Sequence, residues 1–161
     1  MSEPTDLDCQ HFTAGTRGPA GHRVFFLQAA APGELLTVRC EKQHVAALAE
    51  HFESLLADLE PAEGVPADLI EPVEPRFVVG SIAIGYDEDI DRLVVQLHEL
   101  VGEDDPPGDS VRCALGRGLA HAFIARSEEL MNAGRPPCPL CGRPVGADGH
   151  TCVKTNGHFP H

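Results

Sequence analysis

The 161-residue sequence has no tryptophan, one tyrosine and few basic residues. Its 12 Lys and Arg residues stand against 25 Asp and Glu residues, which gives a net charge of −13. Proteins bind nucleic acids by neutralising phosphates with Lys and Arg. The acidic balance therefore argues against a nucleic-acid partner. It favours either simple solubility or a protein partner with a basic surface.

Long apolar runs are also missing from the sequence. The longest runs, such as Val24–Leu27, are far too short to span a bilayer. The first ten residues lack the basic region and apolar stretch of a secretory signal. We therefore expect a soluble, cytoplasmic protein without a membrane segment.

Two stretches of the chain resemble one another. Each reads as three short strands followed by an amphipathic helix. The shared features are a Phe-x-x-Gly-Thr/Ser motif and a Val-Arg-Cys triplet, found at residues 12–16 and 38–40 and again at 77–81 and 111–113. These repeats predict an α+β fold with an internal duplication, whose copies span residues 12–59 and 77–132. The expected product is an antiparallel sheet or half-barrel covered by two helices.

Two segments between these elements are rich in proline, glycine and acidic residues. Residues 60–75 join the halves, and residues 102–109 form a second acidic loop. Their small apolar content predicts that they are the most mobile parts of the body, with at most one helical turn at residues 67–70. Gly134, Pro136 and Pro137 should end the last helix. This divides the chain into a body (1–134) and a tail (135–161).

The tail carries a zinc-type pattern of cysteine and histidine. Cys138 and Cys141 form a C-P-x-C-G knuckle, which turns both thiols toward one ion. His150 and Cys152 follow two residues apart, so they share one face of an extended segment. These four residues supply the tetrahedral N/S set that zinc prefers, and His158 is a competing fourth ligand. Three thiolates and an imidazole leave no open position, which favours a structural zinc ion over a catalytic one.

Other interpretations of the tail are weaker. A segment this short, with few apolar residues, cannot form a core without a staple, so free thiols on an unsupported tail are less favoured than metal. A redox C-x-x-C usually opens a helix beside a strand, whereas the glycines and prolines around Cys138 oppose a helix. Three further cysteines, Cys9, Cys40 and Cys113, are scattered through the body.

Several parts of the chain resemble an uncharacterised bacterial family, domain of unknown function 3090 (DUF3090). They are the tail with the preceding AGRPPCPLCG and the stretches FTAGTRGPAGHRVFFLQA, EKQHVAALAEHFESLL and VVGSIAIGYDED. That family is found mainly in high-GC Gram-positive bacteria. Its members end in a similar C-P-x-C-G…G-H-x-C…N-G segment, which maps onto Cys138, Cys141, His150 and Cys152. The residue after N-G is often aromatic in the family and is His158 here, so the resemblance favours His150 as the ligand. It implies no activity.

A glycine-rich segment, GTRGPAGHR, spans Gly15–Arg23. Its glycines and basic residues could gather backbone amides around an anion. The alternative function is therefore a small enzyme or binding protein for a phosphorylated metabolite. Phosphate loops normally open a helix, however, and the residues after Arg23 read as a strand, so a hairpin loop is favoured.

No catalytic residue can be assigned from the remaining motifs. The acidic turn at residues 86–91 lacks the late glutamate of a calcium loop and is interpreted as a solvated turn. His44, His51 and His121 have no nucleophile at a matching spacing, and the sequence contains no nucleophile elbow, P-loop or zinc-protease motif. The sequence thus favours a zinc-stapled interaction or adaptor protein over an enzyme.

Overall fold

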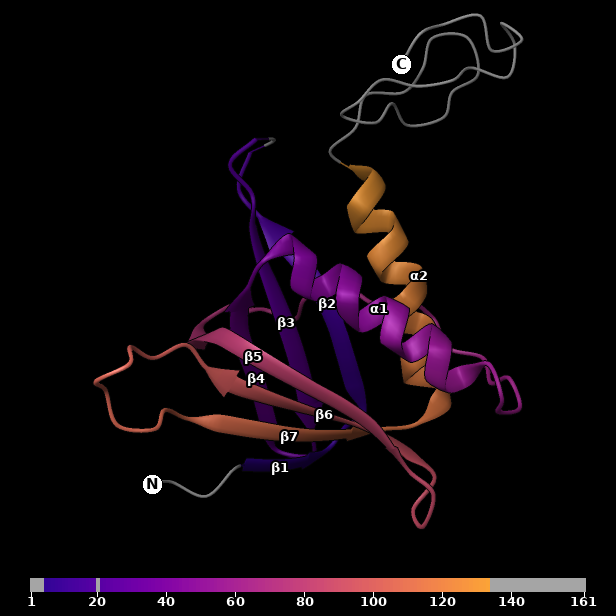
Figure 1. The fold of residues 1–161 in the computed structure, drawn as a ribbon. Coiled ribbons are helices and arrows are strands. Elements are labelled where there is room, and N and C mark those ends of the chain that lie inside the picture. Colours follow the sequence, from indigo (N-terminus) through magenta and orange to yellow (C-terminus); the bar gives the residue numbers. More distant parts are fainter. Residues whose placement is uncertain (1–4, 20, 134–161) are drawn as a thin grey trace, which may run out of the picture.

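The computed structural model describes residues 5–19 and 21–133. Alternating apolar residues build the strands, as in β6, where Leu93, Val95 and Leu97 are buried and the residues between them face outward. The elements in chain order are β1 (Thr5–Asp8), β2 (His11–Arg17), β3 (Val24–Ala31), β4 (Glu34–Cys40), α1 (Lys42–Leu56), β5 (Pro75–Asp87), β6 (Arg92–Glu99), β7 (Ser110–Leu115) and α2 (Arg117–Ala133). Figure 1 shows their arrangement.

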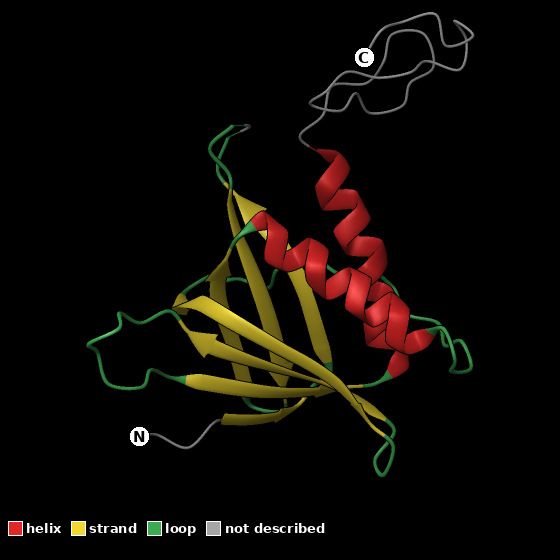
Figure 2. Ribbon diagram, in the orientation of Figure 1, coloured by secondary structure: helices red, strands yellow, loops and turns green. Residues whose placement is uncertain are grey.

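The two helices pack side by side against the strands (Figure 2). Helix α1 buries one stripe of apolar residues at helical spacing, from Val45 to Leu56. At the centre of the core, Phe52 of α1 meets Phe12 of β2 and Phe123 of α2, with ring centroids 5.3–6.2 Å apart. The predicted α+β body with two covering helices is therefore confirmed.

The sheet has seven strands in the order β1-β7-β6-β5-β4-β3-β2. Neighbours pair antiparallel except β4 with β5 and β1 with β7, which are parallel. The chain also joins the two ends of this order. After β1 leaves β7, the Cys9 amide donates to the Ala114 carbonyl and the Gln10 amide donates to the Ala30 carbonyl of β3, both at 2.8 Å. The short link between β1 and β2 thus bridges the two ends of the strand order. The expected antiparallel sheet or half-barrel is corrected, because two of the six strand pairings are parallel.

The order of elements in β2–β3–β4–α1 recurs in β5–β6–β7–α2. In the first set, Val38 pairs with Leu27 and Thr37 with Gln28. In the second, Val111 pairs with Leu97 and Ser110 with His98. In both hairpins the valine of the Val-Arg-Cys triplet thus pairs with a leucine, but the pair lies four residue pairs from the β3–β4 turn and only one from the end of the β6–β7 ladder.

The Phe-x-x-Gly motifs do not hold the same place. Gln28 and His98 occupy corresponding positions, and their partners on the first strand of each set are Thr13 and Ser81. The sequence match instead aligned Ser81 with Thr16, three residues further along β2. A register irregularity between Val79 and Ser81 accompanies this shift.

Residues 57–74, called the crossing segment here, connect α1 to β5 without helix or strand. The segment crosses the outer face of β2 and β3. Thr13 Oγ1 donates to the Ala67 carbonyl at 2.5 Å. Gln28 Oε1 accepts from the Ile70 backbone N–H at 2.7 Å, and Gln28 Nε2 donates to the Ile70 carbonyl at 2.9 Å. Gln28 also donates to Thr37 Oγ1, and within the buried row Thr13–Gln28–Thr37 the first two side chains supply partners for the backbone of the crossing segment.

The crossing segment is also held by packing and charge. Leu69 is buried against Gly15, where any side chain on residue 15 would collide with it. Arg126 of α2 bonds the Ala14 carbonyl and Asp68, both at 3.0 Å. Residues 67–71 are therefore held by specific contacts that the composition of the segment did not indicate, and residues 67–70 form no helical turn.

Within the described part of the chain, no helix is long and apolar enough to cross a membrane.

Candidate functional site

The four predicted zinc ligands, Cys138, Cys141, His150 and Cys152, lie outside the described residues, as does the competing His158. Among the residues that the structure describes, no group of three or more His, Cys, Asp or Glu side chains could hold a metal ion. The zinc assignment therefore stays a prediction from the sequence.

The glycine-rich segment does not form a single anion-binding loop. Gly15 and Arg17 belong to β2, and Arg17 donates to Glu71 of the crossing segment at 2.7 Å. Gly18 and Gly21 take positive φ angles of 107° and 87° in the turn to β3, a conformation that suits glycine. The hairpin interpretation is confirmed, because β2 and β3 pair antiparallel on either side of this turn.

The acidic turn lies at the tip of the β5–β6 hairpin, where Asp91 takes a left-handed φ of 51°. Tyr86 donates to Asp91 Oδ1 at 2.7 Å, and Arg117 at the start of α2 donates to the same oxygen at 3.0 Å. These hydrogen bonds lower the pKa of the Asp91 carboxyl, and the bond to Asp91 raises the pKa of Tyr86. Asp91 thus holds the hairpin tip to α2, and residues 88–91 are exposed, which fits the interpretation as a solvated turn.

The histidines of the helices bond mostly to their own backbone. The Glu41 amide donates to His44 Nδ1 at 3.0 Å at the start of α1, and His51 Nδ1 donates to the Ala47 carbonyl at 2.8 Å. His121 Nε2 is buried and has no hydrogen-bond partner among the described residues. Within the described residues, the imidazoles of His44, His51 and His121 form no hydrogen bond with a serine, threonine or cysteine side chain.

The cysteines of the body are buried free thiols: Cys9, Cys40 and Cys113. Burial, with a smaller effect of Glu41, raises the pKa of Cys40 to about 12. A hydrogen bond to Cys9 and then burial raise the pKa of Cys113. Because the thiolate is the reactive form, these shifts disfavour nucleophilic chemistry at Cys40 and Cys113, whereas the hydrogen bond with Cys113 lowers the pKa of Cys9.

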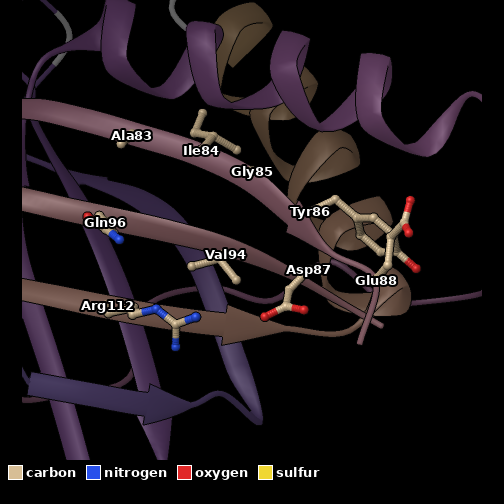
Figure 3. A pocket seen from close by; sticks show the side chains of 9 residues that line it. All are labelled: Ala83, Ile84, Gly85, Tyr86, Asp87, Glu88, Val94, Gln96 and Arg112. Atoms are coloured by element: carbon tan, nitrogen blue, oxygen red, sulfur yellow. The ribbon is translucent and has the colours of Figure 1, made fainter. Parts of the chain in front are cut away.

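A hollow of about 440 Å³ lies on the outer face of β5, β6 and β7 (Figure 3). A row of paired residues crosses it from strand to strand: Ala83 pairs with Gln96, and Gln96 with Arg112. Beside this row, Gly85 pairs with Val94. The small residues of β5 leave the floor open, while Gln96 and Arg112 offer hydrogen-bond donors.

The remaining side chains that line this hollow are Ile84, Tyr86, Asp87 and Glu88. The lining therefore combines apolar residues with two carboxylates, a phenol and the guanidinium of Arg112. Sequence reasoning did not single out this site. The alternation of small residues in β5, Ala83 and Gly85, was the signal that could have indicated an uncovered sheet face.

With the fold and these sites described, the chain can be compared with known proteins. The family model described as a protein of unknown function (DUF3090) matches residues 7–152. The chain belongs to the DUF3090 family. The match extends over the body and reaches Cys152, and it stops before His158 and His161. No curated protein and no solved structure matches this DUF3090 protein.

Proposed function

We propose that this DUF3090 protein is an interaction or adaptor protein whose tail is stapled by one structural zinc ion. The ligands are Cys138, Cys141, His150 and Cys152. The observation that carries the proposal is their spacing, a C-x-x-C knuckle followed by H-x-C. The extent of the family match supports it, since residues 7–152 include all four ligands and exclude His158.

The division into a body (1–134) and a zinc-binding tail (135–161) belongs to the same proposal. It is supported by Gly134, Pro136 and Pro137, which oppose the continuation of a helix, and by the hydrophobic core that the described residues form among themselves. We further propose that the body arose by internal duplication. The matching pairs Val38–Leu27 and Val111–Leu97, followed in each half by a helix, support this origin.

The proposed partner is a protein with a basic surface, and the proposed location is the cytoplasm. Support for the partner comes from the net charge of −13. A binding role, as opposed to an enzymatic one, is supported by the chemistry of the described body. The Cys40 and Cys113 thiols have raised pKa values.

Metal analysis of the full chain tests the proposal. Native mass spectrometry should find one zinc ion per chain, and X-ray absorption should find three sulfur ligands at about 2.3 Å and one nitrogen at about 2.0–2.1 Å. Cys138→Ser should lose the ion, whereas Cys40→Ser, which alters a buried thiol of the body, should keep it. A chain purified without zinc that does not take it up would refute the zinc assignment.

A further inference from the structure

Three exposed apolar side chains gather at one end of β5 and β6. Leu100 is 63% exposed, Val101 42% and Val78 40%. A hydrogen bond of 2.7 Å from the Leu100 amide to the Val78 carbonyl holds the two backbones together. We call these three residues the apolar patch. Isolated exposed apolar residues are ordinary, but a group of them on one surface is typical of a contact site.

The loop of residues 102–109, between β6 and β7, lies against this patch and projects from the end of the sheet (Figure 1). Together they line a hollow of about 590 Å³, which includes Leu100, Val101 and the two prolines of the loop. The loop is braced from within: Asp105 accepts from the Gly102 amide at 2.8 Å, and Glu99 accepts from the Asp109 amide at 2.8 Å. These two hydrogen bonds give the loop its shape beside the hollow.

The rim of the hollow is negatively charged. Glu103, Asp104 and Asp105 form no ion pair with any described residue, whereas Asp109 at the base of the loop pairs with Arg76 at 2.6 Å. Adjacent carboxylates attract cations and repel acidic surfaces. A second copy of this acidic chain would bring like charges together here, and so would a nucleic acid.

We propose that the apolar patch and the acidic loop 102–109 form the docking site for an extended, basic and apolar segment of a partner protein. The inference rests on the proposed interaction function and locates its surface. An apolar side chain of the partner covers Leu100, while Lys or Arg residues on either side face Glu103 and Asp104. Apolar anchors mainly set the dissociation rate of such a complex, and charges at the rim mainly set its association rate and salt dependence.

The test uses the full chain and a defined probe, a ten-residue peptide of alternating Lys and Leu, with an alternating Glu and Leu peptide as its control. Binding of the Lys–Leu peptide should shift the backbone NMR signals of residues 78 and 99–109. Leu100→Ser should weaken its affinity at least fivefold. Ile90→Ser, which alters a 49% exposed residue at the opposite end of the same strands, should leave the affinity unchanged.

A charge variant gives an independent readout. The double variant Glu103→Gln, Asp104→Asn should weaken binding and flatten its salt dependence. The matched variant Glu50→Gln, Glu53→Gln, which alters two exposed carboxylates of α1, should do neither. The proposal is overturned if the signals that shift lie elsewhere, if Leu100→Ser and Ile90→Ser behave alike, or if the Glu–Leu peptide binds equally well.

The outcome also separates this surface from the zinc tail. Binding by the Cys138→Ser protein should equal that of the unmodified chain, because the patch belongs to the body. If the peptide binds at the patch and the purified chain contains no zinc and takes none up, only the zinc assignment is contradicted. If the tail holds zinc and the peptide does not bind at the patch, only the docking site is contradicted.

Discussion

Replacing Gly15 by alanine tests whether the crossing segment is part of the folded core. A methyl group on Gly15 would lie 2.4 Å from Leu69 Cγ and 2.7 Å from its Cδ1, closer than atoms can approach. Gly15 lies in a strand, so alanine meets no backbone strain there, and the collision is the main effect. Because Leu69 is buried, it cannot simply swing aside. We expect Gly15→Ala to lower the free energy of unfolding by about 1–3 kcal/mol.

Urea unfolding followed by circular dichroism measures this loss. A matched control is Gly85→Ala, since a methyl group on this strand glycine meets no atom within 4 Å. It should be neutral or stabilise by up to about 1 kcal/mol. The double variant Gly15→Ala, Leu69→Ala should be less destabilised than the sum of its parts, by about 0.5–3 kcal/mol. If Gly15→Ala behaves like Gly85→Ala, or if the two changes simply add, then Leu69 is not held against β2 in solution.

Two further predictions concern contacts of the described body. Tyr86 is the only tyrosine, and its hydrogen bond to Asp91 raises its pKa. An ultraviolet titration should therefore give a tyrosine pKa above the ordinary value of about 10, and Asp91→Asn should lower that pKa. A titration that Asp91→Asn leaves unchanged would contradict the contact. The backbone amide of Ile70 donates to Gln28 Oε1, so it should exchange its hydrogen slowly in the unmodified chain and faster in Gln28→Leu. The amides of Glu103 and Asp104 should exchange fast in both proteins. Fast exchange at Ile70 in the unmodified chain would show that the crossing segment is loosely held.

Local patterns in the sequence were enough to predict both helices and six of the seven strands, and only β1, before the first predicted strand, was missed. Period-two alternation in β6 and helical spacing from Val45 to Leu56 each determine which face is buried, so strands and helices could be placed without tertiary information. The α+β class and the two helices followed from them. The hairpin at Gly18–Gly21 was predictable for the same reason, since its glycines lie between two strand patterns.

The link between the two ends of the sheet depends on contacts between distant residues, which no local pattern reveals. The Gln10 amide donates to the Ala30 carbonyl and the Cys9 amide to the Ala114 carbonyl, and the sequence offers no sign of these two hydrogen bonds. The crossing segment misled us for a related reason. Its composition is typical of a linker, but its backbone is satisfied by Thr13 and Gln28, which lie far away in the sequence. One buried leucine, Leu69, then adds the packing that the composition did not indicate.

The candidate site was predictable only in the tail, because C-x-x-C and H-x-C spacings carry metal chemistry without reference to the fold. The hollow on β5–β7 and the apolar patch arise where uncovered faces and loop ends meet. Val78 and Leu100 are two unremarkable apolar residues in the sequence and become neighbours only through the sheet.

The most direct test of the zinc assignment is the metal content of two histidine variants of the full chain. Native mass spectrometry of His150→Ala and His158→Ala should be recorded at increasing concentrations of a zinc chelator. The account predicts that His150→Ala gives up its zinc at a much lower chelator concentration than the unmodified chain, while His158→Ala retains it almost unchanged. Loss of zinc from His158→Ala with retention in His150→Ala, or no zinc in the unmodified chain, would contradict it.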